Sequence, residues 1–196
     1  SELFGEYPFI NEKYGHADFR WGGGMEHQTM TSMGGYSQNL IAHELGHSWW
    51  GNLITCKTFH DIWLNEGFAG YCQALWVEHR DGEQAYFSFM NNHAYYGGGT
   101  VYVENPSSNF MIFNSSLSYN KASWVLHMLR HIVGDNTFFN ILRSYGSNDS
   151  LAYNVASTSD FQTVCESVSG LDFDDFFNQW IYGDRHPHYQ LSWWHE

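Results

Sequence analysis

The sequence is poor in positive charge. It has 8 lysines and arginines against 21 aspartates and glutamates, a net charge of −13 over 196 residues. Proteins that bind nucleic acid or an anionic membrane normally carry a basic patch. The longest basic stretches here are two pairs, His79-Arg80 and Arg130-His131. We therefore expect no nucleic-acid partner.

Long apolar runs and cysteine pairs are also missing. The chain contains no run of about 18 apolar residues, so we expect no membrane span. Its three cysteines, Cys56, Cys72 and Cys165, form no C-x-x-C pair. An odd number without that spacing indicates neither a disulfide scaffold nor a zinc finger. What is present is a hydrophobic share of 43%, sufficient for a core in a chain of this length.

Composition divides the chain into a strand-and-loop part and a longer helical part. Residues 1–36 are rich in glycine and aromatic residues, and a triple glycine excludes a regular helix there. Apolar periodicity then predicts a buried helix over about 38–50. A second helix with Asn65 as its N-cap is predicted to end at Asp81-Gly82, and a third follows over about 83–94.

The remainder combines a long loop with a helical array. Residues 95–117 are rich in Gly, Asn and Ser, and loops of this length are often binding segments. Residues 118–186 contain amphipathic segments that begin near Asp or Ser and end at Gly, the usual helix boundaries. No repeat or linker separates these parts, so we expect one domain over 1–196.

The stretch IAHELGHSWWGNLIT, residues 41–55, carries the first chemical signal. His43 and His47 lie on one face of the predicted helix, where two imidazoles can hold one metal ion, typically zinc. Glu44 lies about 100° around the helix from His43, a poor place for a third ligand. It can instead take a proton from a metal-bound water. Two histidines packed in an ordinary core helix remain the alternative at this point.

Glu66, in the stretch WLNEGFAG, supplies a candidate third ligand. It falls in the first turn of the second predicted helix. Two histidines and one glutamate leave a fourth position open for water, as in catalytic rather than structural zinc sites. Taken alone, Glu66 could also be a carboxylate that is stabilised by the positive end of its helix.

Together these residues resemble the gluzincin aminopeptidases, the family of aminopeptidase N and leukotriene hydrolase. The His-Glu-x-x-His helix is followed at the family's spacing by Glu66 and then by Gly-Phe-Ala. Residues 23–27, GGMEH, are similar to the Gly-x-Met-Glu-Asn exopeptidase motif, and residues 119–122, YNKA, to the Tyr-x-Lys-Gly/Ala motif. The resemblance covers nearly the whole chain, whereas thermolysin-like endopeptidases share only the helix motif.

The resemblance implies a zinc-dependent aminopeptidase that hydrolyses the N-terminal peptide bond by attack of a zinc-bound water. His43, His47 and Glu66 match the ligands of one zinc ion. Glu44 matches the general base that deprotonates the water, and Tyr119 matches the hydrogen-bond donor to the oxyanion.

The exopeptidase motif implies where the substrate binds. Glu26 matches the residue that pairs with the free α-amine, which explains cleavage next to the N-terminus. Gly23 and Gly24 would let the substrate backbone lie along an edge strand. Met25 and the 95–117 loop would shape the pocket for the first side chain.

The resemblance also implies the fold. We expect an α+β, mainly helical, thermolysin-like metallopeptidase catalytic domain with a small N-terminal mixed β-sheet. Residues 1–36 would carry the exopeptidase motif, 37–94 the zinc-binding helices and 118–186 the C-terminal helices. The family has further domains on both sides, so we expect an excised catalytic part. Its partners would be those flanking domains and peptides with a free N-terminus.

Two alternatives stay open: a zinc endopeptidase of thermolysin type, and a catalytically weak peptide-binding domain. One departure concerns His27, which stands where the family has asparagine and could change the subsite or its pH dependence. The Gly-, Asn- and aromatic-rich composition resembles secreted bacterial members. That composition favours a periplasmic or extracellular location without deciding it.

Overall fold

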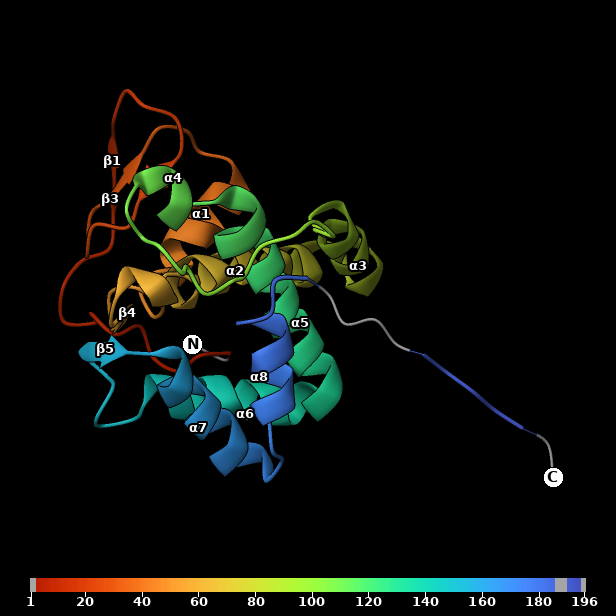
Figure 1. The fold of residues 1–196 in the computed structure, drawn as a ribbon. Coiled ribbons are helices and arrows are strands. Elements are labelled where there is room, and N and C mark those ends of the chain that lie inside the picture. Colours follow the sequence, from red (N-terminus) through yellow and green to blue (C-terminus); the bar gives the residue numbers. More distant parts are fainter. Residues whose placement is uncertain (1–2, 186–189, 195–196) are drawn as a thin grey trace.

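The computed structural model describes residues 3–185 and 190–194, in which a strand-rich part lies beside a larger helical part (Figure 1). β1 (His16–Asp18) pairs in parallel with β3 (Thr31–Met33), and β2 (Gly24–Met25) pairs antiparallel with β3. The sheet is therefore mixed and small, as predicted, and its strand order leaves β2 at an edge.

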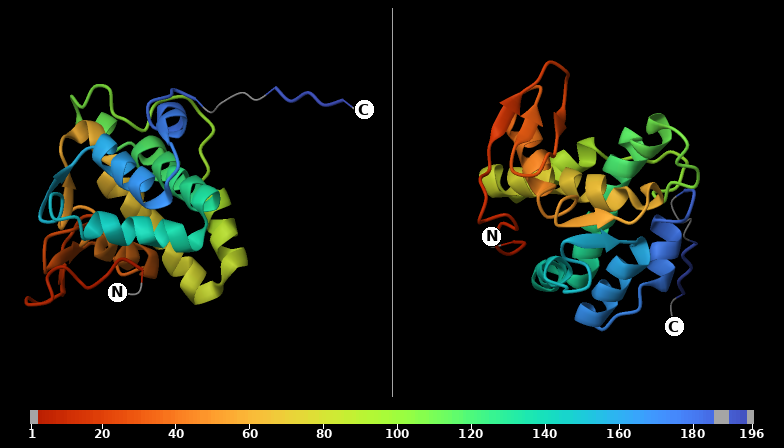
Figure 2. Two further views of the ribbon diagram at one scale, coloured as in Figure 1. Left: turned by 90° about the horizontal axis from the view of Figure 1, so that it is seen from below. Right: turned by 90° about the vertical axis from the view of Figure 1, so that its left-hand side faces the viewer.

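Helices make up most of the rest of the described chain, and two views show them packed around α2 (Figure 2). None of them is both long and apolar enough to cross a membrane. The predicted 118–186 segment ends at a residue outside the described part. The helices are α1 (Gln38–Gly46), α2 (Trp63–Asp81), α3 (Glu83–Asn92), α4 (Asn109–Ile112), α5 (Ala122–Val133), α6 (Asp135–Gly146), α7 (Thr158–Ser169) and α8 (Asp174–Trp180).

The first helix is shorter than predicted. Ser37 caps it, as its hydroxyl accepts a hydrogen bond from the backbone of the first turn. The helix ends before Trp50, however, because the N–H groups of Ser48 and Trp49 donate to carbonyls three residues earlier rather than four. The N–H groups of residues 52–54 then donate to carbonyls five residues earlier, which widens the turn. Gly51 then adopts a φ of 146°, which no helix contains. This widened turn places Trp50 in the core.

The second helix starts earlier than predicted, and Asn65 is not its N-cap. α2 begins at Trp63, whose ring is fully buried and donates from Nε1 to Thr158 Oγ1 (2.8 Å). Asn65 lies inside the first turn, and its Oδ1 accepts a hydrogen bond from the backbone N–H of Cys56 (2.9 Å). Burial of the tryptophan has overridden the capping preference. The predicted end is confirmed, since Gly82 terminates the helix with a φ of 87°.

Two features of the fold were not predicted. A second, two-stranded sheet pairs β4 (Ile54–Cys56) in parallel with β5 (Asn154–Ala156), which joins the segment after α1 to the C-terminal helices. The predicted 95–117 loop contains α4 and runs into a π-helical segment, Ser115–Lys121, that continues directly into α5.

The core is built largely from aromatic rings around Phe161. This residue of α7 is fully buried, and its ring contacts four other aromatic rings at centroid distances of 5.0–6.2 Å. Those rings belong to Trp63, Phe68, Tyr145 and Phe177. Because Trp63 and Phe68 flank Glu66 on α2, this cluster holds the start of α2 in place.

We predict that Phe161→Ala lowers the free energy of unfolding by about 3–5 kcal/mol, because it removes a ring from a packed core and leaves a cavity. Phe110→Ala is the matched control, since Phe110 is 83% exposed. It should change stability by less than about 0.5 kcal/mol. Urea unfolding followed by circular dichroism measures both, and equal effects would contradict the assigned core.

Candidate active site

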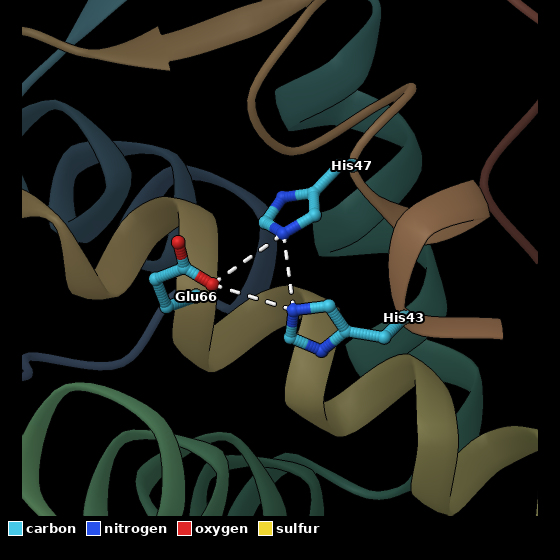
Figure 3. A group of neighbouring side chains, drawn as sticks. All are labelled: His43, His47 and Glu66. Carbon is cyan, nitrogen blue, oxygen red and sulfur yellow. Dashed lines mark hydrogen bonds and ion pairs between the residues drawn. The ribbon is translucent and has the colours of Figure 1, made fainter. Parts of the chain in front are cut away.

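Three predicted ligand residues meet at one point (Figure 3). His43 Nε2 and His47 Nε2 are 3.2 Å apart, and each lies 3.4 Å from Glu66 Oε2. Donors about 2.0–2.1 Å from a tetrahedral zinc ion lie about 3.3 Å from one another. The triangle therefore has the size and the donor set of a zinc site.

Close packing of α1 on α2 brings the three residues together. A Cβ on Gly46 would lie 2.8 Å from Cys72 Sγ, so only glycine allows the two helices to approach this closely. His43 lies in the last turn of α1, His47 directly follows the helix, and Glu66 lies in the first turn of α2. All three ligand residues are buried.

The two imidazoles are oriented in different ways. His47 Nδ1 lies 2.9 Å from the carbonyl oxygen of Trp50, so the widened turn after α1 fixes its ring. His43 Nδ1 is buried and has no hydrogen-bond partner among the described residues. The His43 ring instead stacks on Tyr119, with centroids 6.0 Å apart and planes 13° apart.

Charge is unequally shared in the metal-free triangle. Burial lowers the pKa of His43. Burial alone would also lower the pKa of His47, but the hydrogen bond and charge of Glu66 outweigh it and raise that pKa to about 9. Burial would raise the pKa of Glu66, yet hydrogen bonds from the two histidines hold it at about 2. His47 and Glu66 thus form an ion pair at neutral pH.

Glu44 lies beside the triangle, and the pKa of its carboxyl group is unusually high. Burial, together with the charges of Glu26 and Glu66, raises its pKa to about 7 against the opposing effect of His47. A carboxyl group with this pKa can both accept and release a proton near neutrality. The backbone of Gly24 passes directly over it, because a Cβ there would lie 2.4 Å from the Glu44 carboxyl carbon.

Glu26 extends the cluster of acids towards β2. One oxygen each of Glu26 and Glu44 and a nitrogen of His47 lie within 4.8 Å of one another. The backbone carbonyl of Glu26 accepts a hydrogen bond from Asn52 Nδ2 (2.9 Å). Asn52, which no sequence motif indicates, thus ties the turn after α1 to residues 23–27. His27, by contrast, is exposed and bonds Ser32 Oγ through Nδ1 (3.0 Å).

Tyr119 lines the same cavity as the three predicted ligand residues. Burial, followed by the charge of Glu66, raises its pKa well above the usual range for a tyrosine. Its hydroxyl therefore stays protonated and available as a donor. The residue lies in the π-helical segment before α5, a local geometry that is frequent at functional sites.

All nine predicted site residues line one cavity of about 880 Å³. They are Gly23, Gly24, Met25, Glu26, His43, Glu44, His47, Glu66 and Tyr119. The predicted 95–117 loop contributes Phe113, whose ring contacts that of Phe59 (6.4 Å between centroids). Residues 55–59 also form part of the wall, although no motif in the sequence marks them. Only their position directly after the histidine motif could have indicated this.

Comparison with known families and relatives is consistent with this site. Residues 24–180 match the peptidase family M1 domain. Aminopeptidase N of Lactococcus lactis subsp. lactis is 31% identical over 160 residues, which are 76% of this chain and 19% of that protein. Aminopeptidase M1-B of Oryza sativa subsp. japonica is 31% identical over 194 residues, 90% of this chain and 21% of the relative. The chain thus spans about a fifth of these curated relatives.

Solved structures show the same architecture. The M1 zinc metallopeptidase from Deinococcus radiodurans superimposes with a TM-score of 0.82 at 26% identity, over 95% of this chain and 43% of that one. Native yeast LTA4 hydrolase gives a TM-score of 0.66 at 24% identity, over 87% and 31% of the two chains, and is similar in fold.

The ionised His47 predicts that metal binding releases a proton. At pH 7.5 the imidazole holds a proton that a metal must displace, because a ligand histidine is neutral. In a Glu44→Gln background, which removes a carboxyl group that titrates near neutrality, calorimetry in buffers of different ionisation enthalpy should detect at least about one proton released per zinc ion. The part of the release that comes from His47 should be lost as pH rises through about 9, which leaves only the proton given up by a zinc-bound water.

Glu66→Gln in the same background is the control. Without that carboxylate, burial favours neutral His47, so zinc should bind more weakly and release about one proton fewer at pH 7.5 than in the Glu44→Gln protein. Zinc binding whose enthalpy is independent of the buffer in the Glu44→Gln protein would contradict the assigned ion pair.

Proposed function

This chain belongs to peptidase family M1, and we propose that it carries the active site of a zinc-dependent aminopeptidase. The observation that supports this most directly is the presence of Glu26 in the same cavity as the His43, His47 and Glu66 triangle. A metal triangle alone fits any zinc hydrolase. A carboxylate next to it gives a physical reason to select substrates with a free N-terminal ammonium group.

Zinc fits the donors that are present. Two imidazole nitrogens and one carboxylate oxygen are the ligand set of catalytic zinc sites with an open position, and their spacing matches tetrahedral coordination. When bound there, zinc would lower the pKa of a water molecule and polarise the substrate carbonyl. His43, His47 and Glu66 are the proposed ligands.

Glu44 is the proposed general base and then general acid. It would accept a proton as water attacks the carbonyl carbon of the first peptide bond. It would then deliver that proton to the nitrogen of the leaving amine as the C–N bond breaks. The pKa of Glu44 is about 7 in the metal-free site, and a bound dication would lower it and favour the ionised form that accepts the proton. Tyr119 would donate its hydroxyl hydrogen to the oxyanion, the role for which a raised pKa keeps it protonated.

Glu26 and β2 are proposed to set the exopeptidase register. The carboxylate of Glu26 would pair with the substrate α-amine, while the free edge of β2 at Gly23, Gly24 and Met25 would bind the substrate backbone as an added strand. Met25 is 43% exposed at the cavity, a suitable position to contact the first side chain.

We extend the proposal to the fold and the wider protein. The helix pair that holds the ligands, the preceding small sheet and the following helical array support a thermolysin-like catalytic domain that spans 1–196. Within it, 1–36 would carry the exopeptidase motif, 37–94 the zinc-binding helices and 118–186 the C-terminal part. The share of the curated relatives that this chain covers supports flanking domains as partners. Peptides with a free N-terminus are the proposed substrates.

Glu44→Gln in the full-length protein should lower kcat for amino-acid anilides about 10²–10⁴-fold, because it removes the proton acceptor. Zinc content, measured by atomic emission, should not change, since Glu44 is not a proposed ligand. Glu6→Gln is the matched control, because Glu6 is exposed and does not line the cavity. Near-normal hydrolysis by the Glu44→Gln protein would rule out this mechanism.

Acetylation of the substrate α-amine should abolish hydrolysis by the full-length protein, because the blocked nitrogen carries no charge for Glu26. Glu26→Gln should lower kcat/KM for free-amine substrates about 10–100-fold, the size of one charged hydrogen bond. The same substitution should also reduce the ratio of kcat/KM for free-amine substrates to kcat/KM for acetylated substrates. Equal hydrolysis of both by the parent protein would instead indicate an endopeptidase. A zinc-loaded protein that binds but does not hydrolyse them would indicate a peptide-binding domain.

A further inference from the structure

The contact between α2 and α5 adjoins the main chain next to Glu66 and that of Tyr119, and it has no role in the proposed chemistry. We propose that Ala122 and Ser123, at the start of α5, are positioning residues that set the place of the Tyr119 hydroxyl relative to Glu66. This inference rests on the proposed function, in which Tyr119 donates a hydrogen bond to the oxyanion.

The first observation is the local geometry of Tyr119. It lies in the π-helical segment, which gives way to the regular α-helix at Ala122. A π-helical turn holds more residues than an α-helical one. The direction of the Tyr119 side chain therefore depends on where the regular helix begins, and thus on what holds Ala122 in place.

The second observation is the closeness of the two helices. A Cβ on Gly67 would lie 2.5 Å from the Cβ of Ala122, and a Cβ on Gly70 would lie 2.6 Å from Ser123 Oγ. α2 thus exposes bare backbone at two positions one turn apart, and the first residues of α5 fill that space. Ala122 is fully buried, so a larger side chain there would push the helices apart.

The third observation is a buried hydroxyl between the two functional segments. Ser123 Oγ lies 3.0 Å from the carbonyl oxygen of Gly67 and 2.8 Å from that of Tyr119. Gly67 directly follows the proposed ligand Glu66. The single hydroxyl hydrogen of Ser123 is therefore shared between the main chain next to the ligand and the main chain of the oxyanion donor.

These contacts fix two groups whose relative position matters for the reaction. A donor aimed at a developing oxyanion must be held within roughly half an ångström to be effective. α2, which carries Glu66, and α5, which continues from Tyr119, meet at Gly67 and Ala122. Only the methyl group of Ala122 lies between the two backbones. A small residue at position 122 is thus required by the spacing of Glu66 and Tyr119, which accounts for the alanine that ends the YNKA motif.

A double-mutant cycle in the full-length protein tests the inference. Tyr119→Phe should lower kcat about 10²-fold, as loss of an oxyanion donor does. Ala122→Val should lower kcat at least about 10-fold, because it displaces the donor, with KM and zinc content nearly unchanged. Combined with Tyr119→Phe, it should lower kcat less than about 2-fold further, because the group it misplaces is already gone.

Ala74→Val is the matched control: the same enlargement at another fully buried alanine of the helical core. Its effect on kcat should be the same with Tyr119 or Phe at position 119. Should Ala122→Val fail to fold, Ser123→Ala, which removes the shared hydroxyl without adding bulk, is tested in the same cycle. A crystal structure of the folded, zinc-loaded variant should show the Tyr119 hydroxyl displaced from Glu66.

The measurements distinguish the positioning role of Ala122 and Ser123 from the role of Tyr119 as the oxyanion donor. If Tyr119→Phe alone retains kcat, the proposed role of Tyr119 is wrong and the inference falls with it. If Tyr119→Phe lowers kcat but Ala122→Val or Ser123→Ala lowers it by the same factor in both backgrounds, the contact is ordinary packing. In that case only the positioning role is overturned.

Discussion

The close approach of α1 to α2 is the constraint on which the site depends. Three donor atoms 3.2–3.4 Å apart, from two helices, require backbones that nearly touch, and Gly46 makes this possible. A similarly close approach occurs between α2 and α5, where Gly67 and Gly70 of α2 leave room for the start of α5. The bare backbone thus belongs to α1 in the first contact and to α2 in the second. The large residues Trp63 and Phe68 anchor α2 in the aromatic core.

Burial of charged groups shifts the pKa values in the site and also destabilises the metal-free protein. Three carboxylates, Glu26, Glu44 and Glu66, lie around one cavity in a protein that is already strongly acidic. Buried charges are tolerated only when paired, and without a metal only the His47–Glu66 pair meets that condition. Glu44 responds by a raised pKa. A divalent cation between these groups would offset the repulsion, so the acids that would serve the chemistry also favour metal binding.

The sequence predicted which residues come together but not the backbone that holds them. His43, His47 and Glu66 could be singled out because a metal site requires fixed donor types at helical spacing, and all nine predicted site residues line one cavity. The end of α1 and the start of α2 were misplaced, because burial of Trp50 and Trp63 outweighs local capping rules. Asn52 was not predicted, because a side chain that bonds a distant backbone carbonyl leaves no periodic pattern in the sequence. Residues 55–59 were not predicted either, because pairing with the distant strand β5 positions this segment.

The pairing of β4 with β5 has a consequence for how the protein acquires its site. Thr55 and Cys56 of β4 form part of the cavity wall, yet their partner strand lies beyond α6, so that Thr55 pairs with Val155. Such long-range contacts form late because closing the intervening loop is entropically costly. During synthesis α1 and the following His47 leave the ribosome well before β5 exists. The cleft wall is then an uncovered strand edge, open to pairing with other chains, until the C-terminal helices arrive to complete it.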